Sequence, residues 1–134
     1  MTMNLADSTR NAMLEAFEAD IGTSAILEGF TGSKPANCAA ADSGTKLFSM
    51  TLPSDWMSAA ASGSKAKLGT WEDLAGDAAG DCGYYRIKTS GAVCKAQGTV
   101  TATGGGGDMT LDNINVAVGQ KVTVTGFTLT AGNP

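Results

Sequence analysis

The first hydrophobic pattern in the chain has the period of an α-helix. Between residues 5 and 21, apolar side chains recur at helical spacing, and acidic side chains occupy the opposite side. This predicts one amphipathic helix over 5–21. Asp7 or Ser8 can cap its start, and Gly22 can close its end in a left-handed conformation. The apolar positions that define the predicted helix are Ala6, Met13, Leu14, Phe17 and Ile21.

From residue 24 onward the pattern changes to short stretches with a period of two, separated by turn-forming residues. Ser90 and Gly91 are suited to a hairpin turn. Gly126 marks a switch in apolar parity, which predicts a β-bulge. Pro53 ends a strand, and Trp56 and Met57 are expected to plug the core. The expected strands are 24–30, 46–52, 84–89, 92–100, 109–111, 114–118 and 121–130, with a further short strand at 66–71.

These segments together predict a mainly β fold. About seven or eight short strands with turn signals between them are typical of a sandwich or a jelly-roll-like barrel. The expected domain organisation is a single domain over 1–134, with the helix at 5–21 and the β region at 24–130. A composition with 18 Gly and 16% charged residues agrees with many turns and short strands.

Charge narrows the range of partners. The net charge is −4, and the nine Lys and Arg residues are scattered along the chain. Nucleic-acid binding depends on neutralising phosphates with clustered cations, so neither DNA nor RNA is expected as a partner. No apolar run approaches the roughly 20 residues that span a bilayer, and residues 1–10 lack a signal-peptide pattern. We therefore expect synthesis in a cytoplasm and no membrane partner.

The cysteines are expected to be plain thiols. Cys38, Cys82 and Cys94 are an odd number in a chain without a secretion signal, which argues against a disulfide framework. The chain contains no His, the usual partner of cysteine in compact metal sites. No metal and no other cofactor is predicted.

Candidate catalytic chemistry is sparse. Without His, neither a Ser-His-Asp nor a Cys-His arrangement can form. A glycosidase needs two carboxylates on opposite sides of a sugar, and the 13 acidic residues mark no particular pair. The acidic segment with Glu72, Asp73, Asp77 and Asp81 has oxygen ligands that suit calcium, but not the spacing of an EF-hand, so a solvated acidic loop is favoured. No catalytic residue is predicted.

Two further features have weak functional readings. The glycines of 104–107 lack the Lys-Ser or Lys-Thr of a phosphate-binding loop and precede a strand, so they indicate a flexible loop. Aromatic side chains can stack on sugars or bases, but here no convergent set of polar residues accompanies them, and packing is favoured. The aromatic residues in question are Trp56, Trp71, Tyr84 and Tyr85.

The run of residues also resembles a family of small virion structural proteins of tailed phages and prophages. The similarity covers nearly the whole chain, and its most specific part is the terminal block, 107–133. The matching segments, in order after an Ala-rich N-terminal helix, are FTGSKPA, LFSMTLPSDW, GYYRIKTSGA, QGTV and GDMTLDNINVAVGQKVTVTGFTLTAGN. These are turn and strand sequences without catalytic signatures.

The resemblance implies a virion structural role, and the acidic charge favours the outside of the head over its DNA-filled interior. We expect a capsid decoration or cement protein that binds the major capsid protein, stabilises the head, and self-associates as a dimer or trimer. The alternative is a tail- or fibre-associated component that binds the host; a cell-wall glycosidase comes third. The candidate interface residues on the helix are Met13, Phe17 and Ile21, which suit packing on the chain's own sheet as well as on a neighbour. In the tail-associated alternative, exposed Trp71, Tyr84 and Tyr85 would serve as contact anchors.

Overall fold

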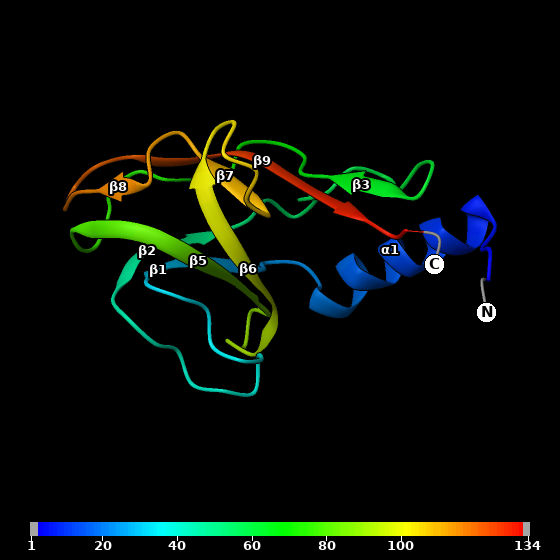
Figure 1. The fold of residues 1–134 in the computed structure, drawn as a ribbon, viewed down its shortest axis with the longest axis horizontal. Helices are drawn as coiled ribbons and strands as arrows, with labels where there is room; N and C mark the ends of the chain where they lie inside the picture. The colour runs from blue at the N-terminus through cyan, green and yellow to red at the C-terminus, as the bar shows by residue number, and fades with distance from the viewer. Residues whose placement is uncertain (1–2, 133–134) are drawn as a thin grey trace.

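The structure is a computed structural model that describes residues 3–132 (Figure 1). One helix is followed by a series of strands, as the sequence pattern predicts. The helix α1 covers Asp7–Ile21, and the strands are β1 (Ile26–Thr31), β2 (Lys46–Thr51), β3 (Ser64–Ala66), β4 (Glu72–Asp73), β5 (Gly80–Lys88), β6 (Cys94–Ala102), β7 (Met109–Leu111), β8 (Asn115–Val116) and β9 (Val122–Thr130).

The strands form one curled, mixed sheet. Its order is β2-β1-β5-β6-β7-β9-β3, with β4 also paired to β9 and β8 paired to β5. The β6–β7 pair is parallel, and the other pairs are antiparallel. In Figure 1 the sheet bends around an interior, and α1 extends beyond it at one end of the long axis, beside β3. The predicted mainly β class is confirmed, and the curled sheet is consistent with a sandwich.

The two ends of α1 differ in how well the sequence predicted them. Ala6 precedes the first helical residue, and no side chain caps the helix there, so the capping role expected of Asp7 or Ser8 is wrong. Asp7 is already inside the helix, where its carboxylate pairs with Arg10 at 2.9 Å. At the other end Gly22 has a positive φ of 81°, and its N–H donates to the carbonyl of Glu18. The role of Gly22 in closing the helix is confirmed.

Two predictions about strands meet different outcomes. Thr110 pairs with Gly126 and Leu111 pairs with Val124, so Thr125 is an extra residue and the predicted bulge in β9 is confirmed. The strand predicted at 66–71 is wrong. The chain instead contacts β9 twice, through β3 and then through β4, and the segment between them leaves the sheet. Trp71, which gave that segment its apolar appearance, is buried between these two short pairings.

A connected set of aromatic rings fills the interior. Trp56 and Met57 are 1% and 2% exposed, which confirms the prediction that they plug the core. Ring centroids lie 6.0 Å apart for Phe17–Trp56, 5.9 Å for Trp56–Trp71, 5.6 Å for Trp71–Phe127 and 5.7 Å for Tyr85–Phe127. Such rings bury large apolar areas in offset or edge contacts, so this row ties the helix to the far side of the sheet.

Among the described residues, no helix has both the length and the apolar character that crossing a bilayer requires.

Candidate functional site

The predicted helix interface divides between the core and the surface. Ile21 is buried, and Phe17 is half-buried against the core. Met13 is 55% exposed, and Leu14 takes the inward position in its place. Only Met13 of these three predicted interface residues is therefore free to contact another molecule with most of its side chain.

Polar contacts fasten the other side of α1 to the chain segment around β3. Arg10 donates to the carbonyl of Ala131 at 2.6 Å, and Asn11 accepts from the N–H of Gly63 at 2.9 Å. Glu15 accepts from the N–H of Ala60, and this hydrogen bond, followed by that from Lys65, lowers the pKa of the Glu15 carboxyl. The helix is thus held in a defined orientation with Met13 directed outward.

Lys65 is the most buried cation in this junction, with 1% exposure. Its ammonium group lies 3.0 Å from a Glu15 oxygen and 2.8 Å from a Glu18 oxygen, and it donates to the carbonyl of Ser58. Burial by itself lowers the Lys65 pKa, but the hydrogen bonds that its ammonium group donates to Glu18 and Glu15 outweigh this effect and raise the pKa overall. Lys65 therefore stays charged and serves to join the helix to the sheet.

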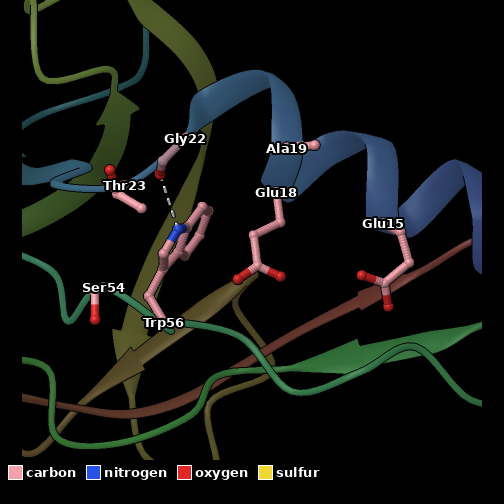
Figure 2. A pocket seen from close by; sticks show the side chains of 7 residues that line it. All are labelled: Glu15, Glu18, Ala19, Gly22, Thr23, Ser54 and Trp56. Carbon is pink, nitrogen blue, oxygen red and sulfur yellow. Dashed lines mark hydrogen bonds between the residues drawn. The ribbon is translucent and has the colours of Figure 1, made fainter.

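A cleft of about 260 Å³ lies beneath the second half of α1, and Figure 2 shows the side chains that line it. The carboxylates of Glu15 and Glu18 point into the space between the helix and the strands. The indole N–H of Trp56 donates to the carbonyl of Gly22 at 3.2 Å, and both carboxylates pair with Lys65, so these three side chains have partners within the chain. The cleft walls are Glu15, Glu18, Ala19, Gly22, Thr23, Ser54 and Trp56.

The three aromatic residues expected as exposed anchors are buried. Trp71, Tyr84 and Tyr85 are 1%, 0% and 4% exposed, so the expectation of exposure is wrong for all three. Trp71 and Tyr85 belong to the aromatic row in the interior. Tyr84 lies on the opposite side of β5 and stacks on Phe30, with ring centroids 4.9 Å apart. Successive side chains of β5, including Tyr84 and Tyr85, point to opposite faces, and both of these side chains are buried. The sequence pattern could not distinguish such a strand from one with an exposed face.

The face of the sheet that carries Tyr84 lies under the loop 32–45, and we call it the covered face. It consists of Glu28 and Phe30 on β1 and Tyr84, Arg86 and Lys88 on β5, which pair across the two strands. Arg86 donates to the carbonyls of Ala40 and Asn37 and pairs with the carboxylate of Asp42 at 2.9 Å. The hydroxyl of Tyr84 donates to the carbonyl of Ser43 at 2.6 Å.

Lys88 completes this network. Its ammonium group pairs with Glu28 and lies 2.9 Å from an oxygen of Asp42, while Lys46 reaches the second oxygen of Glu28 at 3.2 Å. Burial lowers the Lys88 pKa, but the hydrogen bonds that its ammonium group donates to Glu28 and Asp42 raise it overall. Burial would raise the Asp42 pKa, but its contacts with Lys88 and Arg86 lower it overall. The charges are thus matched within the chain, which makes their role structural.

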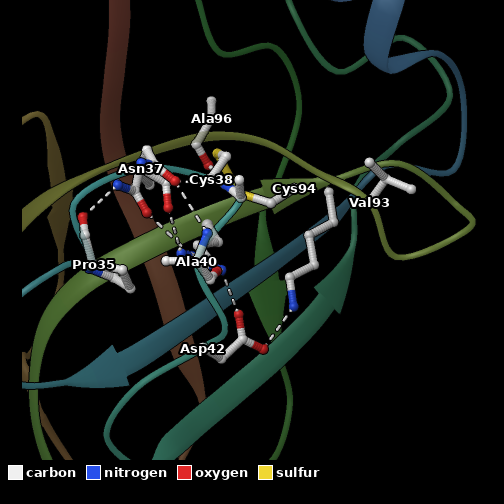
Figure 3. Close-up of a disulfide and its surroundings, with 12 residues drawn as sticks. Pro35, Asn37, Cys38, Ala40, Asp42, Val93, Cys94 and Ala96 are labelled. Carbon is white, nitrogen blue, oxygen red and sulfur yellow. Dashed lines mark hydrogen bonds and ion pairs between the residues drawn. A yellow bond between two sulfur atoms is a disulfide. The ribbon is translucent and has the colours of Figure 1, made fainter.

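A disulfide fastens the same loop to β6. Cys38 and Cys94 are bonded, with their Cα atoms 5.4 Å apart, so the prediction of three plain thiols is wrong (Figure 3). Cys82 is the free cysteine of the described residues; it is buried, and burial raises the pKa of its thiol to about 11, which leaves it unreactive at neutral pH. The earlier argument from an odd number of cysteines failed because one buried thiol does not prevent the other two from pairing.

The acidic segment 72–81 joins the two margins of the curled sheet. One oxygen of Asp73 accepts from the N–H of Ser49 at 3.1 Å, and the N–H of Asp77 donates to the carbonyl of Leu47 at 2.8 Å. These contacts occupy the outer edge of β2, which would otherwise present unpaired backbone groups. Within residues 3–132, no cluster of Cys, Asp or Glu side chains is arranged to hold a metal ion.

The exposed large apolar side chains include two pairs near opposite ends of the molecule. Met3 and Met13 are 52% and 55% exposed at the helix end. Leu74 and Val118 are 71% and 72% exposed at the other end, where backbone hydrogen bonds join Gly76 to the turn 117–120 beyond β8. In Figure 1 these regions lie at the right and left ends of the long axis. Sequence reasoning named Met13 alone among these four residues.

Sequence reasoning also missed Asp42, Arg86, Lys88 and Asp108. Arg86 and Lys88 alternate on a predicted strand opposite Glu28 on another, and this alternation of charges is a signal that a covered polar face was present. Asp108 gave no such signal, because it follows a glycine-rich loop where an exposed Asp is ordinary.

The comparisons with known proteins found no match: no family model, no curated protein and no solved structure is significantly similar to this chain.

Proposed function

We propose that this chain is a structural protein of a tailed-phage particle that binds the outside of the head as a decoration protein. The support is the resemblance of its sequence segments to small virion proteins. The observation that carries the proposal is the exposure of large apolar side chains, Met3 and Met13 towards one end of the long axis and Leu74 and Val118 towards the other.

Such an arrangement suits a protein that bridges neighbouring subunits of a shell. Each end offers apolar side chains for a separate neighbour, and the curled sheet with its aromatic row fixes the distance between them. Contacts that exist only in the assembled shell shift the equilibrium toward that shell by mass action. Because the shell repeats the same surface many times, each copy can bind weakly and still contribute.

The first test measures particles made with and without this chain. We expect a copy number comparable to that of the major capsid protein, surface labelling on heads, and earlier release of DNA on heating when the protein is absent. A few copies per particle with labelling restricted to tails would instead support a tail-associated, host-binding component, and absence from purified particles would contradict any virion role.

The second test asks whether the two ends carry the binding. Met13→Asp and Val118→Asp place a charge on side chains that are mostly exposed, so the fold should tolerate them within about 0.5 kcal/mol. Each should reduce binding to heads that lack the protein. Ser90→Asp, in the exposed turn between β5 and β6, is the matched control and should bind as the wild type does. Equal binding by all three variants would contradict the bridging arrangement.

A further inference from the structure

The disulfide joins two segments that other contacts already hold together. Cys38 lies in the loop over the covered face, and Cys94, the first residue of β6, is 56 positions further along the chain. Gln97, on the same strand as Cys94, donates through its side-chain amide to the carbonyl of Pro35 at 2.7 Å. Its side-chain oxygen accepts from Nε of Arg86 at 3.2 Å. The strand β6 therefore contacts both the loop and the covered face through groups other than the sulfur atoms.

Contacts on both sides of Cys38 fix the loop to β5. Arg86 donates to the carbonyls of Asn37 and Ala40 at 3.1 and 2.9 Å, and these two residues lie on either side of Cys38 in the sequence. The side-chain oxygen of Asn37 accepts from the N–H groups of Ala39 and Ala40, so the turn through Cys38 is also stabilised locally. The position of Cys38 thus follows from hydrogen bonds of its neighbours with a buried guanidinium.

These hydrogen bonds do not depend on the oxidation state of the sulfur atoms. Their partners are backbone carbonyls, side-chain amides and a guanidinium, and a guanidinium stays charged at any physiological pH. Figure 3 shows the two cysteines directly beside Asn37, Ala40 and Asp42. We therefore expect the loop to keep its place when the disulfide is reduced, with the two thiols left next to each other.

The three cysteines differ in how readily a sulfur compound in solution can reach them. Cys38 and Cys94 are half-buried, whereas Cys82 is 2% exposed. Thiol–disulfide exchange needs an accessible thiolate. The Cys82 thiol meets neither requirement, because it is buried and burial raises its pKa to about 11. An oxidant or a reductant in solution therefore acts on Cys38 and Cys94 and leaves Cys82 out of the exchange.

We propose that the Cys38–Cys94 bond is a redox-controlled crosslink, which forms on a loop already in place and is opened again by reductant. In reducing surroundings the chain folds with both thiols reduced. A low-molecular-weight disulfide such as oxidised glutathione then supplies the oxidising equivalents. One cysteine thiolate attacks it and releases one reduced glutathione, which leaves a mixed disulfide; the thiolate of the other cysteine displaces the second glutathione. The two thiols lose two electrons and two protons, and the oxidised glutathione takes them up as two molecules of reduced glutathione.

The crosslink makes the stability of the protein depend on its redox surroundings without a change of fold. Contacts that hold the two thiols together favour the bond, and the bond favours those contacts by the same factor, because such coupling is reciprocal. A bond between segments 56 residues apart also restricts the unfolded chain. The protein thus becomes more stable when it passes from reducing to oxidising surroundings. This inference is independent of a role in a virion.

The first experiment compares amide spectra of the ¹⁵N-labelled full chain in its oxidised and fully reduced forms. We expect both spectra to be those of a folded protein, with large shift changes limited to residues next to the two cysteines. The N–H of Ser43 donates to the Tyr84 hydroxyl at 3.0 Å, so its signal reports on loop attachment and should keep its position. If the signals of residues 36–43 move to unfolded positions on reduction, the disulfide itself places the loop and the proposal is wrong.

The second experiment measures the equilibrium constant for oxidation of the protein in mixtures of reduced and oxidised glutathione. Gln97→Met removes the hydrogen bond to the loop carbonyl of Pro35 and should lower this constant about fivefold, at the small end of ordinary coupling between two sites. Arg86→Met should lower it about tenfold or more, for the same reason. Lys121→Met, which changes an exposed pair with Glu72, is the matched control and should give the wild-type constant.

Circular dichroism of each reduced variant separates a weakened crosslink from loss of folding, and Gln97→Met keeps the test valid if Arg86→Met does not fold when reduced. Peptide mapping without reductant should find Cys38 joined to Cys94 and Cys82 unmodified. An unchanged constant for Gln97→Met would overturn the proposal, and so would oxidation that joins Cys82 to either of the other two cysteines.

Discussion

Tyr84 and Tyr85 are neighbours in β5, yet their hydroxyls end in two regions with opposite properties. On the covered face, the loop 32–45 supplies partners for the Tyr84 hydroxyl and the Arg86 and Lys88 side chains. On the other face, the Tyr85 hydroxyl lies near Asp108 and makes no hydrogen bond to any described residue. The same hydroxyl group is thus fully hydrogen-bonded on one face of the strand and without a partner among the described residues on the other.

The largest effect is expected on the covered face at Arg86. Arg86→Met should destabilise the protein by about 3 to 5 kcal/mol, because it removes the four hydrogen bonds that this buried guanidinium donates to Ala40, Asn37, Asp42 and Gln97. Urea unfolding measures the change. Lys121→Met, which breaks an exposed pair with Glu72, is the control and should cost less than about 1 kcal/mol. A similar small loss at Arg86 would show that the loop does not depend on this network.

The disulfide of the same region should give the next largest effect. Replacing both Cys38 and Cys94 by Ser should cost about 2 to 4 kcal/mol relative to the oxidised protein, because the bond closes a long loop in the unfolded chain. Reductant should lower the unfolding midpoint of the wild type and leave the midpoint of the double variant unchanged. Thiol titration of the denatured, unreduced protein should find Cys82 alone; three thiols in protein exposed to air would contradict the pairing.

Tyr84→Phe should cost about 1 to 2 kcal/mol, because it removes a donor to the carbonyl of Ser43 and an acceptor for the N–H of the same residue. The loss should be near the lower figure, since Ser43 is exposed and water can replace part of what is removed. Thermal unfolding is a sufficient measurement. A loss greater than that of Arg86→Met would mean that the stacking of Tyr84 on Phe30 had also changed.

Much of the fold was predictable because its signals are local. Helical spacing located α1, alternation located most strands, and Gly126 marked the bulge in β9. The strand predicted at 66–71 failed because Trp71 supplied apolar character to a segment that crosses between two short pairings with β9. Local pattern does not report which distant strand will accept a pairing partner.

The candidate sites were less predictable, because they depend on contacts between segments far apart in the chain. Cys38 and Cys94 are separated by 56 residues, and the loop 32–45 meets β6 only after the sheet has formed. Tyr85 and Asp108 come close together because Gly98 has no side chain to occupy the space between them. A pair of tyrosines in a strand shows that one lies on each face, but not that one face is covered by a loop and the other is left with an unpartnered hydroxyl.

Lowering the pH should reduce the free energy of unfolding modestly, because Asp42, which pairs with the covered face, becomes protonated. Lys88 and Arg86 hold the Asp42 pKa below its ordinary value of 3.8, despite the opposing effect of burial, so the carboxylate stabilises the fold above that value. This contribution should be lost as pH falls from about 4 through the lowered pKa, where the carboxylate becomes protonated. Asp42 is 39% exposed at its side chain, so solvent screening keeps the effect small.

The measurement is the stability difference between the wild type and Asp42→Asn as a function of pH. The difference should be greatest at neutral pH and shrink below about pH 4, because protonated Asp and Asn carry the same charge. A difference that stays constant down to low pH would show that the ion pairs with Lys88 and Arg86 contribute nothing. Glu15 also has a lowered pKa, and its contribution is present in both proteins and cancels.

The smallest change in stability is expected from Tyr85→Phe. Removing the hydroxyl breaks no hydrogen bond within the described residues and leaves the ring packed edge-on against Phe127. The free energy of unfolding should therefore stay within about 0.5 kcal/mol of the wild-type value. Since burial opposes an unpaired polar group, a slight gain is in keeping with the structure. A loss as large as that of Tyr84→Phe would show that the Tyr85 hydroxyl already has a strong partner. The two faces of β5 would then be alike in this respect, with both tyrosine hydroxyls contributing to the stability of the fold.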